Sequence, residues 1–365
     1  MEKYLKYLKI KNFRGLKDLE LNNLNNINVI VGDNNSGKTS LLETILMSQN
    51  YSINNILSSC SRRTLQTSPA SLYNNFLYIF PRNERKLSIS IEYGFESGNV
   101  YKYSMIGNVD QTIFNPEFKN TDGLNEVHAY KMLYGKTINQ FNGVFSAELN
   151  NNIVTKQEIN MNAYESLKIK IVREKNNLTR VCYLSPVDYA MQYSFNSIIR
   201  NEKYKKICIE VLKVFDKNIE DILLVPDEYD IPIQTVKHKI LGNMPLSTYG
   251  DGIKRIVNIA GGIAVAHDGI LLIDEFETAI HVKNYQDIFR FLQLACKQYK
   301  VQLFITTHSI EAIDALLSFD DVVNDNSISF ITLRKDEETG KTLSRTLSGN
   351  EVKENREKFG FEVRL

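Results

Sequence analysis

Residues 27–46 read INVIVGDNNSGKTSLLETIL, and this stretch decides the fold. It begins with a short, mostly apolar run, Ile27–Val31, which predicts a buried strand. Further along, Leu41 and Ile45 recur at the spacing of one helical face. Between these two segments, Gly32–Thr39 matches G-x-x-x-x-G-K-[ST] in full. The stretch therefore predicts a strand, a phosphate-binding loop and a helix, in that order.

The predicted loop has the residue types that bind a nucleoside triphosphate. Its glycines let the chain curl so that successive backbone N–H groups point at phosphate oxygens, and the helix N-terminus adds its dipole. We expect Lys38 to reach the β- and γ-phosphates and the Thr39 hydroxyl to coordinate Mg²⁺. ATP and Mg²⁺ are thus the predicted cofactors. The predicted nucleotide-binding residues of the loop are Gly32, Asn34, Asn35, Ser36, Gly37, Lys38, Thr39 and Ser40.

A second apolar run, Ile270–Ile273, ends in two carboxylates, Asp274 and Glu275. We predict that Asp274 lies at the metal ion and that Glu275 accepts a proton from the water that attacks the γ-phosphate. Adjacent acids after a strand are also common as solvated turn residues. Their occurrence together with the phosphate-binding loop favours the catalytic interpretation.

A third apolar run, Val301–Thr306, leads to His308. Open α/β sheets hold their ligands at the carboxyl ends of parallel strands. We therefore predict that His308 contacts the γ-phosphate or the attacking water. The predicted catalytic residues are Glu275, His308 and Lys38. A purely structural role is the alternative for a single histidine.

The segment Leu246–Gly252 (LSTYGDG) precedes a helical pattern. A serine and two glycines before a helix form a second candidate anion-binding site, made by Ser247, Gly250 and Gly252. The alternative is that Ser247 or Asp251 is simply the N-cap of the helix.

The remaining sequence indicates how the chain is organised. Apolar strands alternate with helices over residues 246–317, which predicts a mainly parallel sheet covered on both faces. Residues 50–180 are rich in Asn, Ser and Tyr and contain a hairpin pattern at 87–105, whereas 187–225 has helical periodicity. We predict an α/β fold of the P-loop NTPase, ABC-ATPase type with antiparallel N-terminal strands. Its parts are a nucleotide-binding core (1–50 and 240–340), an inserted β-rich then helical lobe (51–239) and a C-terminal tail (341–365).

Composition limits the functional classes. The 365 residues are 43% hydrophobic and 24% charged with a net charge of +1, which is typical of a soluble globular protein and gives no global basic field. No run approaches the roughly 18 apolar residues of a membrane helix, and no secretory signal opens the chain. We expect a cytoplasmic protein without a membrane partner. Its cysteines form no CxxC pair and are predicted to be buried, reduced thiols: Cys60, Cys182, Cys208 and Cys296.

With these motifs in this order, the chain resembles ABC-type AAA-family ATPases of the RecF/SMC-like and OLD-like branch. The resemblance is close over residues 1–50 and 240–335, and the lobe between them matches only in general layout. The stretches that carry it are LKIKNFRGLK (8–17), VGDNNSGKTSLLE (31–43), PLSTYGDGIKRI (245–256), GILLIDEFETAIH (269–281) and FITTHSIEAI (304–313).

The resemblance implies that Ser247, Gly250 and Gly252 form a signature motif that completes the ATP site of a second copy. One chain then supplies one P-loop and one signature. Hydrolysis would accordingly need a homodimer, or a higher homo-oligomer, with ATP sandwiched at the interface. Glu275 would be the general base and His308 the switch histidine.

The resemblance also implies that Arg14 lies near the nucleotide. Glu277 and His281 match a D-E-x-E…H continuation, for which a structural role is the simpler interpretation. The signature, STYGDG, differs from the LSGGQ of transporters, and no glutamine of a Q-loop can be identified. The D-x-D pair of a TOPRIM nuclease domain is missing from the sequence, so we expect that the chain does not itself cut nucleic acid.

Three functions are compatible with these features. The leading hypothesis, by resemblance, is a stand-alone ATPase that gates a separate effector such as a TOPRIM-type nuclease, as in bacterial anti-phage defence systems of the PARIS type. The second is a RecF-like ATPase that binds DNA in repair or recombination, although the basic clusters Arg62-Arg63 and Lys203 with Lys205-Lys206 are modest. The third is a nucleotide-dependent switch that seldom hydrolyses ATP.

Overall fold

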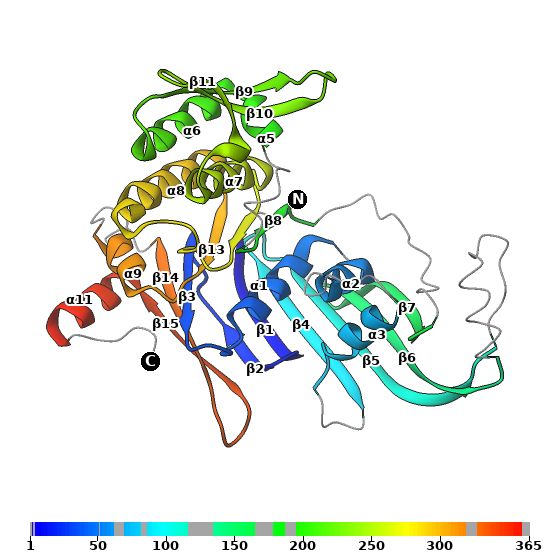
Figure 1. Cartoon of the computed structure of the whole chain (residues 1–365). Coiled ribbons are helices and arrows are strands. Elements are labelled where there is room, and N and C mark those ends of the chain that lie inside the picture. The colour runs from blue at the N-terminus through cyan, green and yellow to red at the C-terminus, as the bar shows by residue number, and fades with distance from the viewer. Residues whose placement is uncertain are drawn as a thin grey trace.

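The computed structural model describes residues 2, 4–50, 52–61, 69–81, 86–115, 134–164, 178–186, 195–318 and 327–359 (Figure 1). Over these ranges the chain forms two six-stranded sheets, one three-stranded sheet and the helices packed on them. No helix within them is both long and apolar enough to cross a bilayer.

The central sheet has the strand order β15-β14-β3-β13-β12-β8. All neighbouring pairs are parallel except β14 and β15, which are antiparallel. The predicted mainly parallel α/β sheet is therefore confirmed. Its strands are β3 (Ile27–Gly32), β8 (Val181–Leu184), β12 (Ile270–Ile273), β13 (Gln302–Thr306), β14 (Ile328–Lys335) and β15 (Thr342–Ser348).

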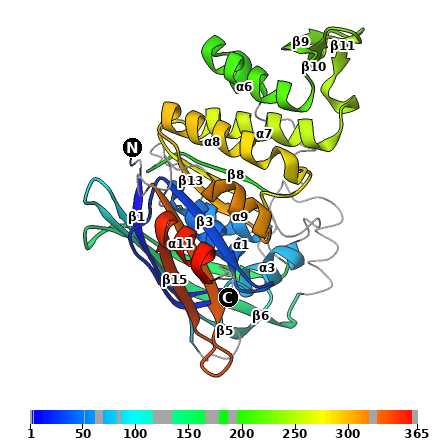
Figure 2. The same ribbon diagram turned by 90° about the vertical axis from the view of Figure 1, so that its left-hand side faces the viewer.

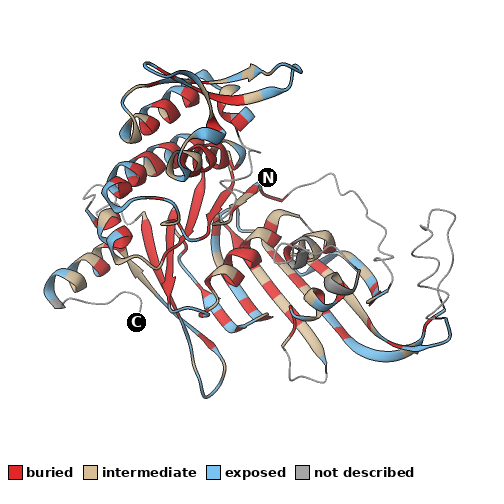
Figure 3. Cartoon of the chain, in the orientation of Figure 1, coloured by how far each residue is buried: buried red, intermediate tan, exposed pale blue. Residues whose placement is uncertain are grey.

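Side chains along each strand alternate between the two faces of the central sheet, and each face has its own buried core. On β3, Val29 and Val31 belong to the hydrophobic core on one face, and Ile30 belongs to the core on the other. Helices α7 (Asp251–Val265), α8 (Tyr285–Tyr299) and α9 (Ile310–Leu317) cover the first face (Figures 1 and 2). Helix α1 (Lys38–Leu46) and the second sheet cover the other. Buried residues consequently line the middle of the molecule (Figure 3).

The second six-stranded sheet is antiparallel, in the order β2-β1-β4-β5-β6-β7. Strand pairing crosses the boundary expected at residue 50, because β1 pairs with β4. Helices α2 (Ile53–Ser61) and α3 (Pro69–Leu77) follow the short η1 turn (Met47–Gln49) and contribute to the same core. The strands are β1 (Leu5–Phe13), β2 (Leu16–Leu21), β4 (Leu87–Phe95), β5 (Val100–Ile113), β6 (Thr137–Leu149) and β7 (Asn152–Asn162).

A smaller unit packs on α7 and α8 (Figure 1). The helical prediction for 187–225 is confirmed at α6 but is wrong from residue 219, where a strand begins, and residues 187–194 lie outside the described ranges. Asp216 ends the helix with an extended backbone and accepts the Asn218 N–H, a local turn that redirects the chain into β9. The unit comprises α5 (Phe195–Ile199), α6 (Glu202–Phe215), β9 (Ile219–Pro226), β10 (Pro232–His238), β11 (Gly242–Pro245) and η3 (Leu246–Thr248).

Within the segment 341–365, expected to be a tail, residues 342–348 form a strand of the central sheet, and residues 360–365 lie outside the described ranges. Strand β15 pairs with β14, and α11 (Gly349–Phe359) buries Val352 in the core. Arg356 of α11 forms an ion pair with Asp314 of α9, with 2.6 Å between Nε and Oδ1. Because β15 is an edge strand with exposed, polar residues, its sequence lacks the apolar run that marks the other core strands.

The described cysteine side chains, Cys182, Cys208 and Cys296, are not joined by disulfides. Cys208 and Cys296 are buried, and burial raises the pKa of each to about 12. Cys182 is half-buried. The predicted burial is therefore confirmed for Cys208 and Cys296 but not for Cys182, and the Cys60 side chain lies outside the described residues.

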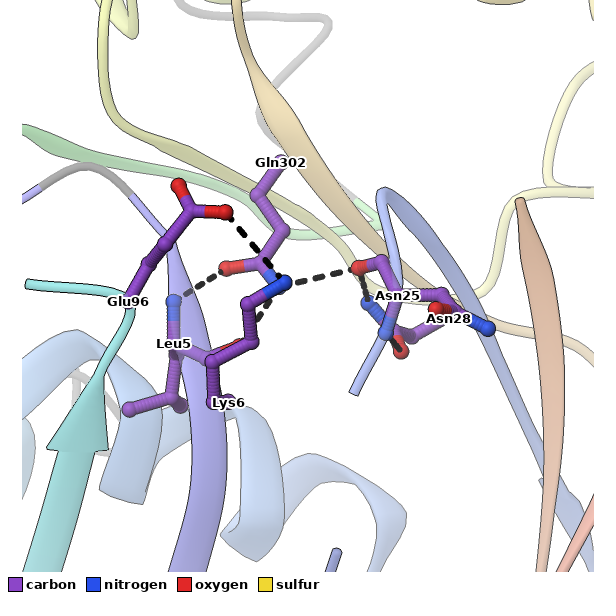
Figure 4. A network of polar contacts seen from close by, with 6 residues as sticks. All are labelled: Leu5, Lys6, Asn25, Asn28, Glu96 and Gln302. Atoms are coloured by element: carbon purple, nitrogen blue, oxygen red, sulfur yellow. Dashed lines mark hydrogen bonds and ion pairs between the residues drawn. The ribbon is translucent and has the colours of Figure 1, made fainter. Parts of the chain in front are cut away.

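A buried amide joins the two large sheets (Figure 4). The side chain of Gln302, at the start of β13, accepts the Leu5 N–H at 2.8 Å through Oε1. Its Nε2 donates to the Leu5 carbonyl at 2.8 Å and to the Asn25 carbonyl at 2.9 Å. Gln302 is 1% exposed. Water therefore cannot replace its amide as the hydrogen-bond partner of the Leu5 N–H and C=O.

Gln302→Leu should lower the free energy of unfolding by about 1–3 kcal/mol, because it leaves the Leu5 N–H and C=O buried and unsatisfied. Urea or thermal unfolding measures this change. Gln298→Leu, on the exposed surface of α8, is the matched control, for which a change within about 0.5 kcal/mol is expected. Equal stabilities of the two variants would contradict the role of Gln302.

Candidate functional site

The loop between β3 and α1 requires glycine at two positions. Gly32 and Gly37 have φ angles of +140° and +104°, in the region that side chains rarely adopt. A Cβ on Gly32 would collide with the Leu333 carbonyl of β14, and one on Gly37 would lie 2.5 Å from Leu16 Cδ2. Asn35 also has a positive φ, +66°. The loop is therefore a tight turn that ends at the N-terminus of α1.

The backbone of this loop is arranged to bind an anion. Gly37 is the N-cap of α1 and offers no side-chain cap, so the first N–H groups of the helix face the loop without an intrahelical acceptor. Asn34 and Asn35 are exposed at the turn, whereas Ser36 and Ser40 are buried.

Lys38 is folded onto the loop. Its Nζ donates to the Gly32 carbonyl at 2.8 Å and to the Asp33 carbonyl at 2.7 Å. Burial lowers the pKa of Lys38. Nearby carboxylates oppose this shift and favour the charged ammonium: Asp274, Asp33, Glu277 and Glu275.

Asp274 is the centre of a hydrogen-bond cluster at the carboxyl ends of the parallel strands. Its Oδ2 accepts from the Thr39 hydroxyl at 2.9 Å and from the Tyr183 hydroxyl at 2.8 Å. Its Oδ1 accepts from the Thr306 hydroxyl at 2.6 Å. The side chain of Asp274 is thus held by α1, β8 and β13, which lie on different sides of it, and the residue is only 4% exposed.

Glu275 follows immediately but points outward and is exposed. Its backbone is in the left-handed region, with φ of +47°, which is unusual for a residue other than glycine. The Glu275 N–H donates to Thr306 Oγ1 at 2.8 Å. A buried and an exposed carboxylate therefore stand side by side, one fixed by hydroxyls and the other accessible to a water molecule.

His308 lies after the end of β13, on the same edge of the sheet as Asp274. Its backbone N–H donates to Glu277 Oε1 at 2.7 Å, and the residue is half-buried. This bond ties the His308 segment to the turn after β12. His281, by contrast, is the N-cap of η4 (Val282–Asn284), where its Nδ1 accepts the Lys283 N–H.

The Ser247–Gly252 segment runs from η3 into the first turn of α7, which begins at Asp251. Neither Ser247 nor Asp251 is the N-cap of this helix, because Gly250 occupies that position and has no side chain to cap it. Ser247 and Gly250 are exposed, and Gly252 is half-buried. The segment is therefore an open helix N-terminus on the surface, as an anion-binding role requires.

Arg14 is directed at the flank of α1. Its Nε forms an ion pair with Glu43 Oε2 at 3.1 Å, and its Nη2 donates to the Ser59 carbonyl at 3.2 Å. Glu43 is 2% exposed and lies in the helix that begins at the phosphate-binding loop. Arg14 is thus placed to hold α1 against the N-terminal strands.

Three residues of the site escaped sequence analysis: Tyr183, Thr306 and Arg255. Tyr183 is paired in register with Leu272 on the neighbouring strand β12. Thr306 ends a predicted core strand, so its hydroxyl was a local signal, whereas no core strand was predicted around Tyr183. The buried Arg255 carries no comparable signal, since it appears in sequence as a charged residue of an amphipathic helix.

The donor set suits Mg²⁺. Thr39 and Asp274 offer adjacent hard oxygen ligands, and the described residues contain no group of three or more His, Cys, Asp or Glu side chains that could hold a metal alone. Mg²⁺ is usually bound by one or two protein oxygens, and water and phosphate oxygens are its other ligands.

The fold and this loop are those of a P-loop protein of the AAA type. The chain belongs to the AAA-domain family, which matches residues 7–241, more than half of its length. A second family, described as "AAA domain, putative AbiEii toxin, Type IV TA system", matches residues 190–314.

Two curated proteins are similar to parts of the chain. An uncharacterized protein of Methanocaldococcus jannaschii is 33% identical over 117 residues, which are 32% of this chain and 98% of that protein. A Helicobacter pylori protein named "ATP/GTP phosphatase" is 27% identical over 131 residues, 34% of this chain and 34% of the relative. The second match therefore spans about a third of that relative.

Solved structures of SMC heads share the fold. An SMC head bound to the C-winged helix domain of ScpA has a TM-score of 0.56 at 13% identity, covering 96% of this chain and 99% of that one. An SMC head with an extended coiled coil, bound to the C-terminal domain of ScpA from Pyrococcus furiosus, has a TM-score of 0.52 at 10% identity, covering 98% and 100%. These likenesses confirm the predicted fold class.

Tyr183→Phe should raise the Mg²⁺ concentration for half-maximal ATP hydrolysis by about tenfold, because residues that orient a metal-binding carboxylate contribute to metal affinity. A Mg²⁺ titration of the ATPase rate measures the shift. Tyr103→Phe, which removes a hydroxyl that donates to the distant Asn50 carbonyl, is the control. A titration curve identical to that of the unaltered protein would argue against the role of Tyr183.

Proposed function

We propose that this chain is a Mg²⁺-dependent ATPase that dimerises around ATP and gates a separate effector protein. The observation that carries the proposal is the 2.9 Å hydrogen bond between Thr39 Oγ1 and Asp274 Oδ2, with Glu275 exposed beside it. These residues supply what phosphoryl transfer to water needs: a phosphate cradle, a metal-side carboxylate and an accessible base.

The residues divide the chemistry between them. The backbone N–H groups of the Gly32–Thr39 loop and the Lys38 ammonium bind the β- and γ-phosphates and stabilise the charge that develops on them. Thr39 and Asp274 would hold Mg²⁺, which would supply positive charge against the negative charge of the phosphates. Glu275 takes a proton as the water oxygen bonds to the γ-phosphorus, and the bond to the ADP oxygen breaks.

His308 is assigned to the γ-phosphate side of the site. Its backbone bond to Glu277 fixes the segment after β13 beside the turn that carries Glu275. The ring is half-buried and lies on the edge of the sheet where ligands of open α/β folds bind. This position supports a contact between His308 and either the γ-phosphate or the attacking water.

Dimerisation is proposed because the second anion-binding segment is on the surface. Ser247, Gly250 and Gly252 open α7 with an uncapped N-terminus, which favours a phosphate brought by another copy. A head-to-tail pair would place two ATP molecules between two loops and two such helix ends. In each half of the pair, the same residues would bind ATP and Mg²⁺. Arg14 would support α1 in each copy.

A partner effector is proposed by analogy. The SMC heads of similar fold were solved with a bound ScpA domain, and one matching family is described as a putative AbiEii toxin of a type IV TA system. The bound ScpA domains support an ATPase that acts on another protein, and the defence setting is proposed from the OLD-like resemblance. A TOPRIM-type nuclease is the effector that the OLD-like resemblance suggests.

The RecF-like DNA-binding alternative gains little from the described residues. Lys205 is 9% exposed and forms an ion pair with Asp221 at 2.8 Å, so it does not extend a free basic surface. Arg62 and Arg63 lie outside the described ranges. ATPase stimulation by duplex DNA at low salt would favour this alternative over the effector hypothesis.

Glu275→Gln should abolish turnover while leaving ATP binding intact, and should trap the dimer in ATP, because only the proton acceptor is lost. Lys38→Ala should lose nucleotide binding as well. ATPase assays, nucleotide titrations and solution mass with and without ATP separate these outcomes. Glu354→Gln, an exposed carboxylate on α11, is the control that should behave like the unaltered protein.

Hydrolysis by Glu275→Gln at the parental rate would refute the catalytic assignment, and a single-chain mass in ATP would refute the sandwich. The effector proposal has its own test, which is co-expression with the products of adjacent genes. A chain that purifies alone whatever is co-expressed would contradict it.

A further inference from the structure

We propose that Arg255 is a positioning residue for ATP hydrolysis: its buried guanidinium fixes the main chain of Asp274 and Glu275 and links it to α7, the helix that follows the Ser247–Gly250 segment. This inference rests on the proposed ATPase function. It adds a residue, and a mechanical connection within one copy, to the catalytic groups described above.

The guanidinium of Arg255 bonds to backbone carbonyls from two separate segments. Its Nη1 donates to the Ser185 carbonyl, just after β8, at 2.7 Å. Its Nη2 donates to the carbonyls of Asp274 and Glu275 at 3.0 Å and 3.4 Å. Arg255 itself lies in α7, so one side chain joins α7, the end of β8 and the turn after β12.

Burial makes this connection specific to arginine. Arg255 is 0% exposed, and a buried cation is tolerated only where acceptors replace water. The planar guanidinium carries five N–H donors in a fixed fork, which can address carbonyls on two segments at once. The compact ammonium of lysine cannot reach both with the same geometry. The position therefore requires the planar shape of the guanidinium as well as its positive charge.

The carbonyl that Arg255 contacts on Glu275 belongs to a strained residue. Glu275 has a φ of +47°, a conformation that persists in non-glycine residues only when the surroundings hold it. Its N–H is held by Thr306 Oγ1 at 2.8 Å, and its carbonyl is held by Arg255. These two bonds, one on each side of the Cα, aim the Glu275 side chain outward from the sheet.

The same helix approaches the turn at a second point. A Cβ on Gly252 would lie 3.1 Å from the Ala279 carbonyl, so the backbone of α7 packs closely on the segment after Glu275. Arg255 follows Gly252 by three residues, nearly one helical turn. A shift of the α7 N-terminus, where the second copy's ATP would bind, must therefore displace the Glu275 backbone.

The test compares Arg255→Lys and Arg255→Met with the unaltered protein. The Met variant should retain ATP affinity within about twofold and still dimerise in ATP, whereas kcat should fall by about 10–100-fold, as expected when a catalytic group is slightly displaced. The Lys variant, which keeps the charge, should lie between the two. Arg356→Met, which removes the ion pair of another bridging arginine, should lower Tm without changing kcat.

Parental kcat in folded Arg255→Lys and Arg255→Met would overturn the proposal. So would a parallel loss of affinity, dimerisation and kcat that merely follows Tm, because that pattern indicates a structural role only. Failure of the parent to hydrolyse ATP would instead refute the proposed function itself.

Hydrogen exchange in the unaltered chain decides the matter if neither variant folds. ATP should change the protection of peptides covering 247–255 and 275–280 with the same midpoint concentration, because Arg255 makes the two segments move together. A change in the first segment without one in the second would contradict the proposal.

Discussion

The carboxylate of Asp274 holds the site together through three hydroxyl groups. Thr39 from α1, Tyr183 from β8 and Thr306 from β13 all donate to it, at 2.6–2.9 Å. Because parallel strands end at the same edge of the sheet, a single buried acid can collect donors from its neighbours on both sides. The position of the phosphate-binding loop relative to β12 and β13 depends on this contact.

The same contact separates the tasks of two adjacent acids. Asp274 is buried and saturated with donors, whereas Glu275 is turned outward by a backbone that only its surroundings maintain. Thr306 serves both residues, since its hydroxyl donates to Asp274 and accepts the Glu275 N–H. A rigid strand end and a strained turn thereby place the carboxylate proposed for the metal ion next to the proposed proton acceptor.

Local patterns in the sequence were sufficient for the core of this account. Strands β3, β12 and β13 are short apolar runs, and the loop after β3 has a specific motif. The type of these elements, and the sheet edge that the strands share, could therefore be predicted. Strand β15 was missed because it is polar and exposed at the sheet edge, and β14, although mostly buried, has Ser329 and Thr332 between its apolar residues. Tyr183 and Arg255 were missed because their roles arise from contacts across 91 and 70 residues of sequence, which no local spacing encodes. The residues proposed to bind the ligand thus lie in local motifs, whereas Tyr183 and Arg255, which contact the Asp274–Glu275 segment, do not.

The central claim is that the Gly32–Thr39 loop is half of an ATP site that a second copy completes. The most direct measurement is the ATPase rate per chain over a dilution series, with the solution mass recorded at each concentration. The account predicts that the rate per chain rises with protein concentration and levels off as the dimer becomes the main species. A constant rate per chain, together with the mass of a single chain in ATP throughout the series, would contradict it.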